Sequence, residues 1–319
     1  MGTDALEASA DVSRDRNRSA HCALHPVTPR RQLPVHSPIS LAALNGAAAA
    51  ATTGRTTSLR AVASQLRKQY ATPRVVLTDS GTSALVMAFR LAVGEGKVVA
   101  IPGYACVDVV AAARFADVRV RVYDIEPETL SPNLESLERT LNRGAHAVLV
   151  AHLYGYPSDM DAVLALAERF GIPVIEDAAQ AAGATYQGRP LGAFGALSVL
   201  SFGRGKGVTG GGGGALLIND SRFDEPLESA LSQIGRPSRG VPNLLVATAL
   251  WALGRPSLYG IPSRIPMLRL GETVYRAAHE PQSISAFSAA LVARGLQAAP
   301  REINTRSRVA ALLSNAVEE

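Results

Sequence analysis

Short apolar runs alternate with amphipathic segments between residues 56 and 220 of the chain. The apolar runs lie at 74–78, 97–101, 118–123, 147–152, 173–176, 197–202 and 214–218. Segments with apolar residues at helical spacing lie at 57–70, 82–93, 105–115, 133–141 and 159–170. Near-continuous apolar strands separated by amphipathic helices are typical of a mostly parallel sheet covered on both faces. The pattern therefore predicts an α/β fold with three layers, α/β/α.

The same pattern divides the chain into three parts. Residues 1–35 are polar and Arg-rich, without apolar periodicity, which predicts a disordered tail. Residues 36–220 carry the alternation and form the predicted large domain, in which 46–54 is a low-complexity patch. Beyond Asp220 strand signals give way to Pro, Arg and helical stretches, so we expect residues 221–319 to be helical, with one helix at 285–296.

Composition narrows the class of protein. With 319 residues, 47% of them apolar, the chain can bury a sizeable core. The net charge is only +5 and the arginines are scattered without interleaved aromatics, so no nucleic-acid partner is indicated. Cys22 and Cys106 are far apart, which indicates neither a disulfide framework nor a metal site and fits a cytoplasmic protein.

Membrane attachment is not favoured by the sequence. The N-terminus lacks the apolar region of a signal peptide and the pattern for myristoylation. The most apolar stretch, 244–253, has about half of the ~20 residues that a membrane-spanning helix needs. We therefore expect a buried or interfacial helix there and no stable membrane insertion.

Polar residues after the predicted strands are the candidate ligand site, because parallel sheets bind ligands beyond the carboxyl ends of their strands. Ser80, Gly81 and Thr82 stand where the first strand gives way to a helix. Backbone N–H groups, hydroxyls and the helix dipole converge there, which suits a phosphate group. Serine, threonine and glycine are also ordinary helix-capping residues, so both interpretations stay open.

Two charged residues follow later strands. Asp177 comes directly after the apolar run, where a carboxylate needs a partner to offset its desolvation. The protonated pyridine nitrogen of a cofactor would be such a partner, and capping of the next turn is the alternative. Lys206 follows another strand and precedes glycines 210–214. Glycines let the backbone approach a planar ring, and partial desolvation lowers a lysine pKa toward the nucleophilic form.

Other interpretations of these residues remain. The Lys206 region could be a flexible basic hairpin, whereas a phosphate-binding P-loop is disfavoured because no Ser or Thr follows the lysine. Tyr104, after the second strand, could stack on a cofactor ring or belong to the core.

Four segments in series resemble one enzyme family. They are SGTSAL, HLYGYPSDMDA, IPVIEDAAQAAGATYQGRPLGAFG, and SF-x3-K followed by GGGGALLIND. They are similar to the DegT/DnrJ/StrS family of sugar aminotransferases, which depend on pyridoxal 5'-phosphate (PLP) and have fold type I. The resemblance runs from about residue 60 to 220 and resumes weakly at 283–312.

The resemblance implies roles for individual residues. Lys206 would hold PLP as a Schiff base and shuttle the proton between substrate and cofactor. Asp177 would pair with the pyridine nitrogen, and Gln180 would lie near the phenolic oxygen. The phosphate would be held by Gly81, Thr82 and Ser201, beside Ser80.

It also implies a reaction and partners. Family members usually move an amino group from glutamate to a keto group on a nucleotide-linked sugar, in polysaccharide or antibiotic biosynthesis. They are usually homodimers with the active site at the subunit interface. Dehydratase relatives carry His at the position of Lys206, so the lysine favours transamination.

The sequence departs from the family pattern at several points. Cys106 stands where Phe or Trp usually stacks on the ring, and Gly212 stands where a carboxylate is usual. An Asn-x-Arg stretch that reaches the partner subunit's phosphate is replaced by residues 281–283. The family's C-terminal small domain normally continues for on the order of 100 residues, a typical domain scale, so we expect 221–319 to contain an incomplete small domain.

Three other functions are alternatives to an aminotransferase. The first is a truncated PLP-binding protein with little activity of its own, needing a full-length partner. The second is a Rossmann-like nucleotide binder, disfavoured because no GxGxxG follows the first strand. The third is a membrane-attached protein that uses residues 244–253.

Overall fold

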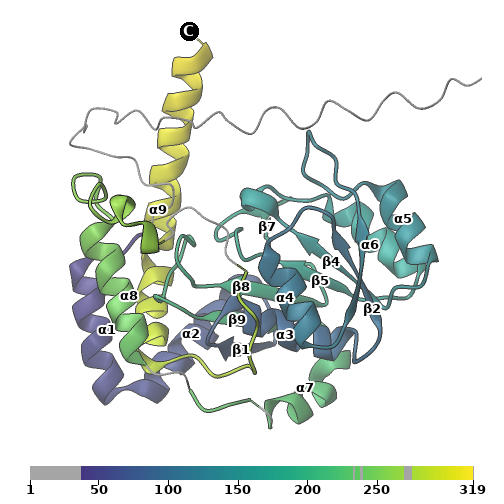
Figure 1. Cartoon of the computed structure of the whole chain (residues 1–319), viewed down its shortest axis with the longest axis horizontal. Coiled ribbons are helices and arrows are strands. Elements are labelled where there is room, and N and C mark those ends of the chain that lie inside the picture. Colours follow the sequence, from purple (N-terminus) through teal and green to yellow (C-terminus); the bar gives the residue numbers. More distant parts are fainter. Residues whose placement is uncertain (1–36, 233, 238–239, 269–274, 319) are drawn as a thin grey trace, which may run out of the picture.

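A seven-stranded sheet forms the centre of the molecule. The computed structural model describes residues 37–232, 234–237, 240–268 and 275–318 (Figure 1), so the tail predicted at 1–35 lies outside the described residues. The strand order is β1-β9-β8-β5-β4-β2-β3. The strands are β1 (Arg74–Thr78), β2 (Val98–Pro102), β3 (Arg119–Tyr123), β4 (Ala147–Ala151), β5 (Val174–Asp177), β8 (Leu197–Ser201) and β9 (Gly214–Ile218). Strand β9 runs antiparallel to both neighbours and the other pairings are parallel, which confirms the mostly parallel sheet.

Helices cover both faces of this sheet. One face carries α3 (Gly81–Ala92), α4 (Val107–Phe115) and α7 (Asp224–Leu231). The other carries α2 (Arg55–Tyr70), α5 (Leu134–Asn142), α6 (Met160–Arg169) and the first turns of α9 (Ala286–Glu318). Within β2, Val99 and Ile101 pack on the first face whereas Ala100 packs on the second. The three predicted layers are therefore confirmed, and a strand buried on both sides explains its unbroken apolar sequence.

Two elements are additional to those expected from the sequence. Most of the alanine-rich patch lies in the helix α1 (Leu41–Thr53). Ser40 caps this helix, because its hydroxyl accepts a hydrogen bond from the Ala43 amide at 3.1 Å. Alanine has the highest helix propensity, so low complexity and helix are compatible here. A short hairpin, β6 (Thr185–Tyr186) and β7 (Arg189–Pro190), turns at Gln187 and Gly188, both with positive φ as a tight hairpin requires.

The C-terminal third of the chain is helical in its described residues. α8 (Gly240–Leu253) contains the apolar stretch 244–253 and packs with α1 and α9. Its Ala247 is buried, but Val241 and Leu245 are exposed, so the helix is buried on one side only. No helix in the described ranges is long and apolar enough to cross a bilayer.

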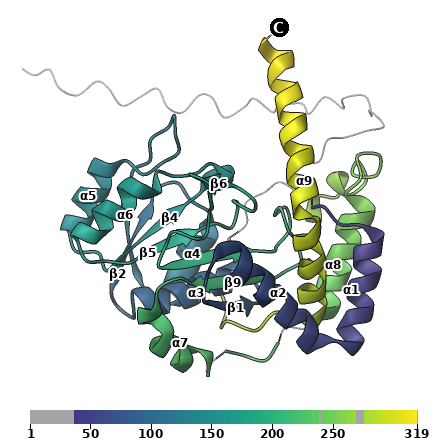
Figure 2. The same cartoon turned by 180° about the vertical axis from the view of Figure 1, so that it is seen from behind.

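Helix α9 is much longer than expected. It was predicted at 285–296 but continues to Glu318, with Pro300 inside it. A proline inside a helix removes one backbone hydrogen bond, and α9 nevertheless continues through Pro300. The last turns of α9 stand out from the rest of the molecule in both views (Figures 1 and 2).

Candidate functional site

The sheet topology brings the candidate residues to one edge. β1 and β8 both run antiparallel to β9, so β1 shares the direction of the parallel strands. The carboxyl ends of β1, β2, β4, β5 and β8 therefore lie at the same edge. Ser80, Tyr104, Tyr154, Asp177 and Lys206 each stand at or shortly after one of these ends.

Asp177 is the last residue of β5 and only 8% of it is exposed. Its Oδ1 accepts a hydrogen bond from the Ala179 amide at 3.0 Å, so Asp177 does cap the turn that follows β5. Burial raises the pKa of Asp177, although the Ala179 hydrogen bond and the positive charge of Lys206 act in the opposite direction. These two effects do not offset the desolvation, so a further positive charge beside the carboxylate would stabilise its ionised form.

Lys206 lies half-buried in the loop that follows β8. Its amine has no hydrogen bond or ion pair with any residue in the part of the chain that the structure describes. Its charge nevertheless acts on two neighbours, because it lowers the pKa of Asp177 and that of Cys106 against the opposing effect of burial. The lysine amine, the carboxylate and the thiol therefore share one electrostatic environment.

The start of α3 brings together residues expected to hold a phosphate. Ser80 caps the helix, since its hydroxyl accepts a hydrogen bond from the Ser83 amide at 3.0 Å. Gly81 lies against Ser201, and a Cβ at Gly81 would be 2.9 Å from the Cβ of Ser201. Such close approach excludes a side chain at Gly81. Thr82 follows in the first turn, where free amides and the helix dipole favour an anion.

Gln180 and Tyr104 are connected through Tyr154, a residue that we did not single out from the sequence. The Gln180 Oε1 accepts a hydrogen bond from the Tyr154 amide at 2.9 Å, and the two tyrosine hydroxyls are 2.6 Å apart. Tyr104 is 54% exposed, which excludes the alternative that it is a core residue. With its oxygen occupied, the Gln180 side chain has its NH2 group left for a ligand.

Below the site lies a buried polar pair that sequence analysis missed. The Glu176 carboxylate is 2.9 Å from His152 Nε2, and both side chains are fully buried. The carboxylate also accepts hydrogen bonds from the amides of Gly192, Phe194 and Gly195 and from the hydroxyl of Ser198. Burial raises the pKa of Glu176, but the hydrogen bonds from His152 and the backbone outweigh it, so the pKa is lowered overall.

The orientation of His152 follows from its two contacts. Its Nδ1 accepts a hydrogen bond from the Ser158 amide at 3.2 Å, so Nε2 carries the hydrogen that is donated to Glu176. The His152 amide donates to the backbone oxygen of Asp177 at 3.1 Å. Two features of the sequence could have indicated this pair: Glu176 lies within the apolar run 173–176, and His152 ends the apolar run 147–152.

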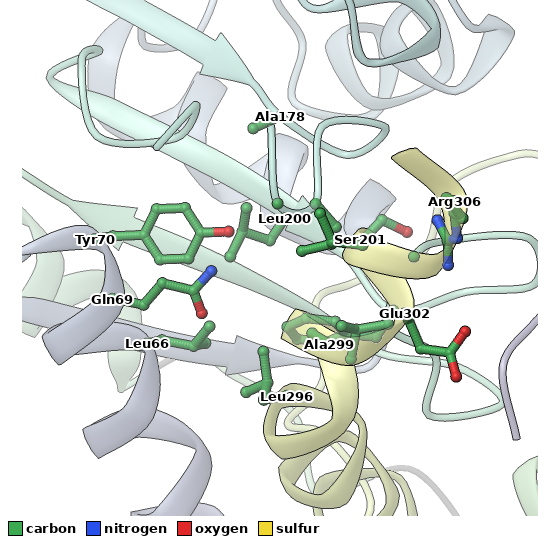
Figure 3. Close-up of a pocket in the computed structure, with 16 residues that line it drawn as sticks. Leu66, Gln69, Tyr70, Ala178, Leu200, Ser201, Leu296, Ala299, Glu302 and Arg306 are labelled. Atoms are coloured by element: carbon green, nitrogen blue, oxygen red, sulfur yellow. The ribbon is translucent and has the colours of Figure 1, made fainter. Parts of the chain in front are cut away.

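A small pocket lies behind the strand ends (Figure 3). It is lined by α2, β8, α9 and Ala178, with the Tyr70 hydroxyl directed toward Leu200, and it holds about 30 Å³. Burial, followed by the charge of Glu176, raises the pKa of Tyr70, which keeps this hydroxyl neutral. The volume corresponds to about one water molecule, so this pocket is too small for an aromatic cofactor.

Comparisons with known proteins agree with this arrangement. The L-glutamine:2-deoxy-scyllo-inosose aminotransferase of Micromonospora echinospora is 40% identical over 157 residues, covering 48% of this chain and 37% of that protein. The dTDP-3-amino-3,4,6-trideoxy-alpha-D-glucose transaminase of Streptomyces venezuelae is 38% identical over 161 residues, covering 49% and 42%. The chain thus spans about half, or less, of the curated relatives that it matches.

A solved structure supports the fold, and a family profile covers most of the chain. A DegT DnrJ EryC1 StrS aminotransferase from Brucella abortus superimposes with a TM-score of 0.67 at 23% identity, covering 87% of this chain and 69% of that one. The profile of the DegT/DnrJ/EryC1/StrS aminotransferase family matches residues 42–319. The chain therefore belongs to the DegT/DnrJ/EryC1/StrS aminotransferase family, with the PLP-dependent fold type I.

Proposed function

We propose that this chain binds PLP at the carboxyl edge of the sheet and acts as an aminotransferase on a keto-sugar or a related cyclic ketone. The observation that carries the proposal is the buried carboxylate of Asp177, with its raised pKa, in the same environment as the unpaired amine of Lys206. A buried acid with one backbone donor, and a lysine amine without a hydrogen-bond acceptor among the described residues, would both gain a partner from one ligand with a basic ring nitrogen and an aldehyde.

The remaining residues fit the other parts of the cofactor. Gly81 against Ser201 leaves backbone and hydroxyl groups for the phosphate, with Thr82 and the start of α3 beside them. The Gln180 NH2 group would donate to the phenolic oxygen. Asp177 would keep the ring nitrogen protonated, and Tyr104 and Cys106 would lie beside the ring.

When bound, PLP supplies an electron sink for the carbanion formed at the substrate carbon. The chain's own contribution would be the Lys206 Nζ, which takes and returns the proton in both half-reactions. His152 and Glu176 would hold the strand ends rigid below Asp177. The donor would be glutamate or, by analogy with the names of the relatives, glutamine, and the acceptor would be a keto group on a nucleotide-linked sugar or cyclitol.

The organisation of the protein is part of the proposal. Residues 36–220 would form the cofactor domain and 221–319 an incomplete small domain. The chain would act as a cytoplasmic homodimer. Exposed apolar side chains on α8, at Val241 and Leu245, offer a surface that a second subunit could cover.

A second candidate is a PLP-binding protein with little activity unless a full-length family member joins it. It is favoured by the apolar residues Leu312 and Leu313, which are exposed on the protruding end of α9. Both candidates share the same cofactor site and differ in turnover.

Reductive trapping would test the site directly. The chain has three lysines, and Lys68 and Lys97 are exposed in contrast to Lys206. Incubation with PLP, reduction with borohydride and peptide mass spectrometry should place the added mass on Lys206. Lys206→Ala should be colourless and unlabelled, while Lys68→Ala and Lys97→Ala should resemble the wild type.

Two results separate the candidates. If glutamate or glutamine bleaches the yellow wild-type protein and a keto-cyclitol restores the colour, the chain is an aminotransferase by itself. If the colour persists with both donors until a full-length relative is added, the second candidate is correct. Label on Lys68 or Lys97, with none on Lys206, would refute both.

A further inference from the structure

Two exposed tyrosines at the carboxyl edge of the sheet are joined through their hydroxyls. Tyr104 is 54% exposed and Tyr154 is 65% exposed, and their oxygens are 2.6 Å apart. We propose that this pair binds the polyhydroxylated ring of the amino acceptor and thereby determines which ketones are used. The inference rests on the proposed function and adds the contact that selects its substrate class.

The chemistry of the pair suits a ring that carries hydroxyl groups. The hydrogen bond between the two tyrosines uses one O–H donor, which leaves the second O–H donor and several lone pairs for a ligand. The exposed ring faces are apolar surface, and ligand sites typically combine such aromatic walls with a few polar groups. A cyclitol or hexose has an apolar C–H face and a rim of hydroxyls, so it matches both features.

Tyr154 is held in an unusual backbone conformation. Its φ is +57°, a left-handed conformation that is rare for a bulky residue. Its amide donates to the Gln180 Oε1, and the following Gly155 packs so closely on the Gln180 backbone that a Cβ there would be 3.1 Å from the carbonyl oxygen. Strain of this kind persists where surrounding contacts enforce it and is concentrated at ligand sites.

The position of the pair links it to the reacting groups. Tyr104 is two residues before Cys106, whose thiol is within the electrostatic reach of Lys206 and Asp177. Tyr154 is two residues after His152 and is bonded to Gln180. The pair therefore lies at the same strand-end edge as Lys206 and Asp177, where we infer that the ketone binds.

A third tyrosine provides a matched control. Tyr156 is 64% exposed, close to the value for Tyr154, but its hydroxyl has no hydrogen-bond partner within the described ranges. Tyr104→Phe and Tyr154→Phe remove one hydroxyl each and keep the rings, and Tyr156→Phe removes a hydroxyl outside the pair. Thermal unfolding of each variant would verify that it folds.

The experiment measures the two half-reactions separately on the PLP-loaded protein. With L-glutamine, Tyr156→Phe should leave the rate of colour loss unchanged, and Tyr104→Phe and Tyr154→Phe should change that rate less than they change the KM for the ketone. With 2-deoxy-scyllo-inosose as the probe ketone, Tyr104→Phe and Tyr154→Phe should raise KM about tenfold with kcat within about twofold, as for the loss of ground-state hydrogen bonds. Tyr156→Phe should leave KM unchanged.

A binding measurement gives a readout independent of turnover. In saturation-transfer NMR, the unreactive polyol scyllo-inositol should receive signal from the wild type and from Tyr156→Phe, and less from the other two variants. Equal KM and equal transfer in all three variants would overturn the inference while leaving the proposed function intact. Failure of the wild type to take up PLP would instead refute the proposed function, and the NMR comparison would still decide whether the tyrosines bind polyols.

Discussion

Two regions of the molecule differ in the kind of side chain that they bury or expose. The first surrounds Glu176 at the middle of the sheet edge, and the second consists of the outer helices of the C-terminal third. Both oxygens of the Glu176 carboxylate accept hydrogen bonds from neighbouring donors, and the carboxylate and His152 are fully enclosed. On α8 and the last turns of α9, large apolar side chains such as Leu245 and Leu313 face outward. In the first region the chain itself supplies the hydrogen bonds of a buried carboxylate, whereas the second region leaves apolar side chains exposed.

This difference separates what the chain completes alone from what it leaves to a partner. Buried hydrogen bonds cost free energy if one member is lost, so the region below Asp177 must form as a unit. Exposed apolar residues that lie together on one helix face can mark a contact surface, and Val241 and Leu245 are four positions apart on α8. We therefore expect the cofactor site to depend on folding of this one chain, and the full activity to depend on association.

The largest effect should come from removing the buried carboxylate. Glu176→Ala leaves His152 and three backbone amides without their acceptor, which should lower the free energy of unfolding by about 3–5 kcal/mol. Glu135→Ala, which breaks an exposed pair with Arg139 in α5, should cost about 0.5 kcal/mol or less. Urea unfolding of both variants checks this; equal losses would mean that the two regions do not differ.

A second contrast uses leucines. Leu217 in β9 is completely buried, so Leu217→Ala should cost roughly 2–5 kcal/mol. Leu313→Ala on α9 should change the stability of the isolated chain by at most about 0.5 kcal/mol. Denaturant midpoints at low protein concentration, where association is minimal, would show the difference.

The pH dependence of stability should also come from the buried region. The folded pKa of Glu176 lies below its ordinary value, so its contribution is fully present above about pH 4.3 and is lost as the pH falls toward the folded pKa. Asp177, with its raised pKa, acts in the opposite sense, because its ionisation as the pH rises disfavours the cofactor-free fold.

Variants can separate these two acids. In Glu176→Gln the loss of stability between about pH 5 and 3 should become shallower, because the depressed carboxyl is gone. In Asp177→Asn the cofactor-free protein should keep its stability as the pH rises above 4. Unchanged slopes in both variants would show that neither acid controls the profile.

The smallest effect on stability, but a visible effect on association, is expected on α8. Leu245→Glu places a charge on the exposed face and should reduce dimerisation while leaving the unfolding free energy of the monomer within about 0.5 kcal/mol. Sedimentation at matched concentrations would measure this. A fully dimeric variant would locate the contact elsewhere, and Leu313→Glu would then test α9.

Most of the architecture could be predicted from the sequence, because apolar periodicity depends mainly on local burial. The strands from β1 to β9 in the large sheet lie within one or two residues of the predicted runs. The sequence analysis did not predict the helix α1, and it predicted only residues 285–296 of α9, which continues to Glu318. α1 packs with α8 and the first turns of α9 in one buried cluster, a contact between distant segments that no local run of residues shows.

The sequence by itself determined which reactive groups the chain carries. Polar residues, Lys206 and Asp177 among them, follow the strands in a fixed order, and this order indicates the family. Only the tertiary structure decided which of these residues meet. The contact of Gly81 with Ser201, the Tyr104–Tyr154 hydroxyl pair and the burial of His152 on Glu176 each join residues from different strand ends. Such contacts depend on strand order and twist, which are set by the whole core and not by any local run of residues.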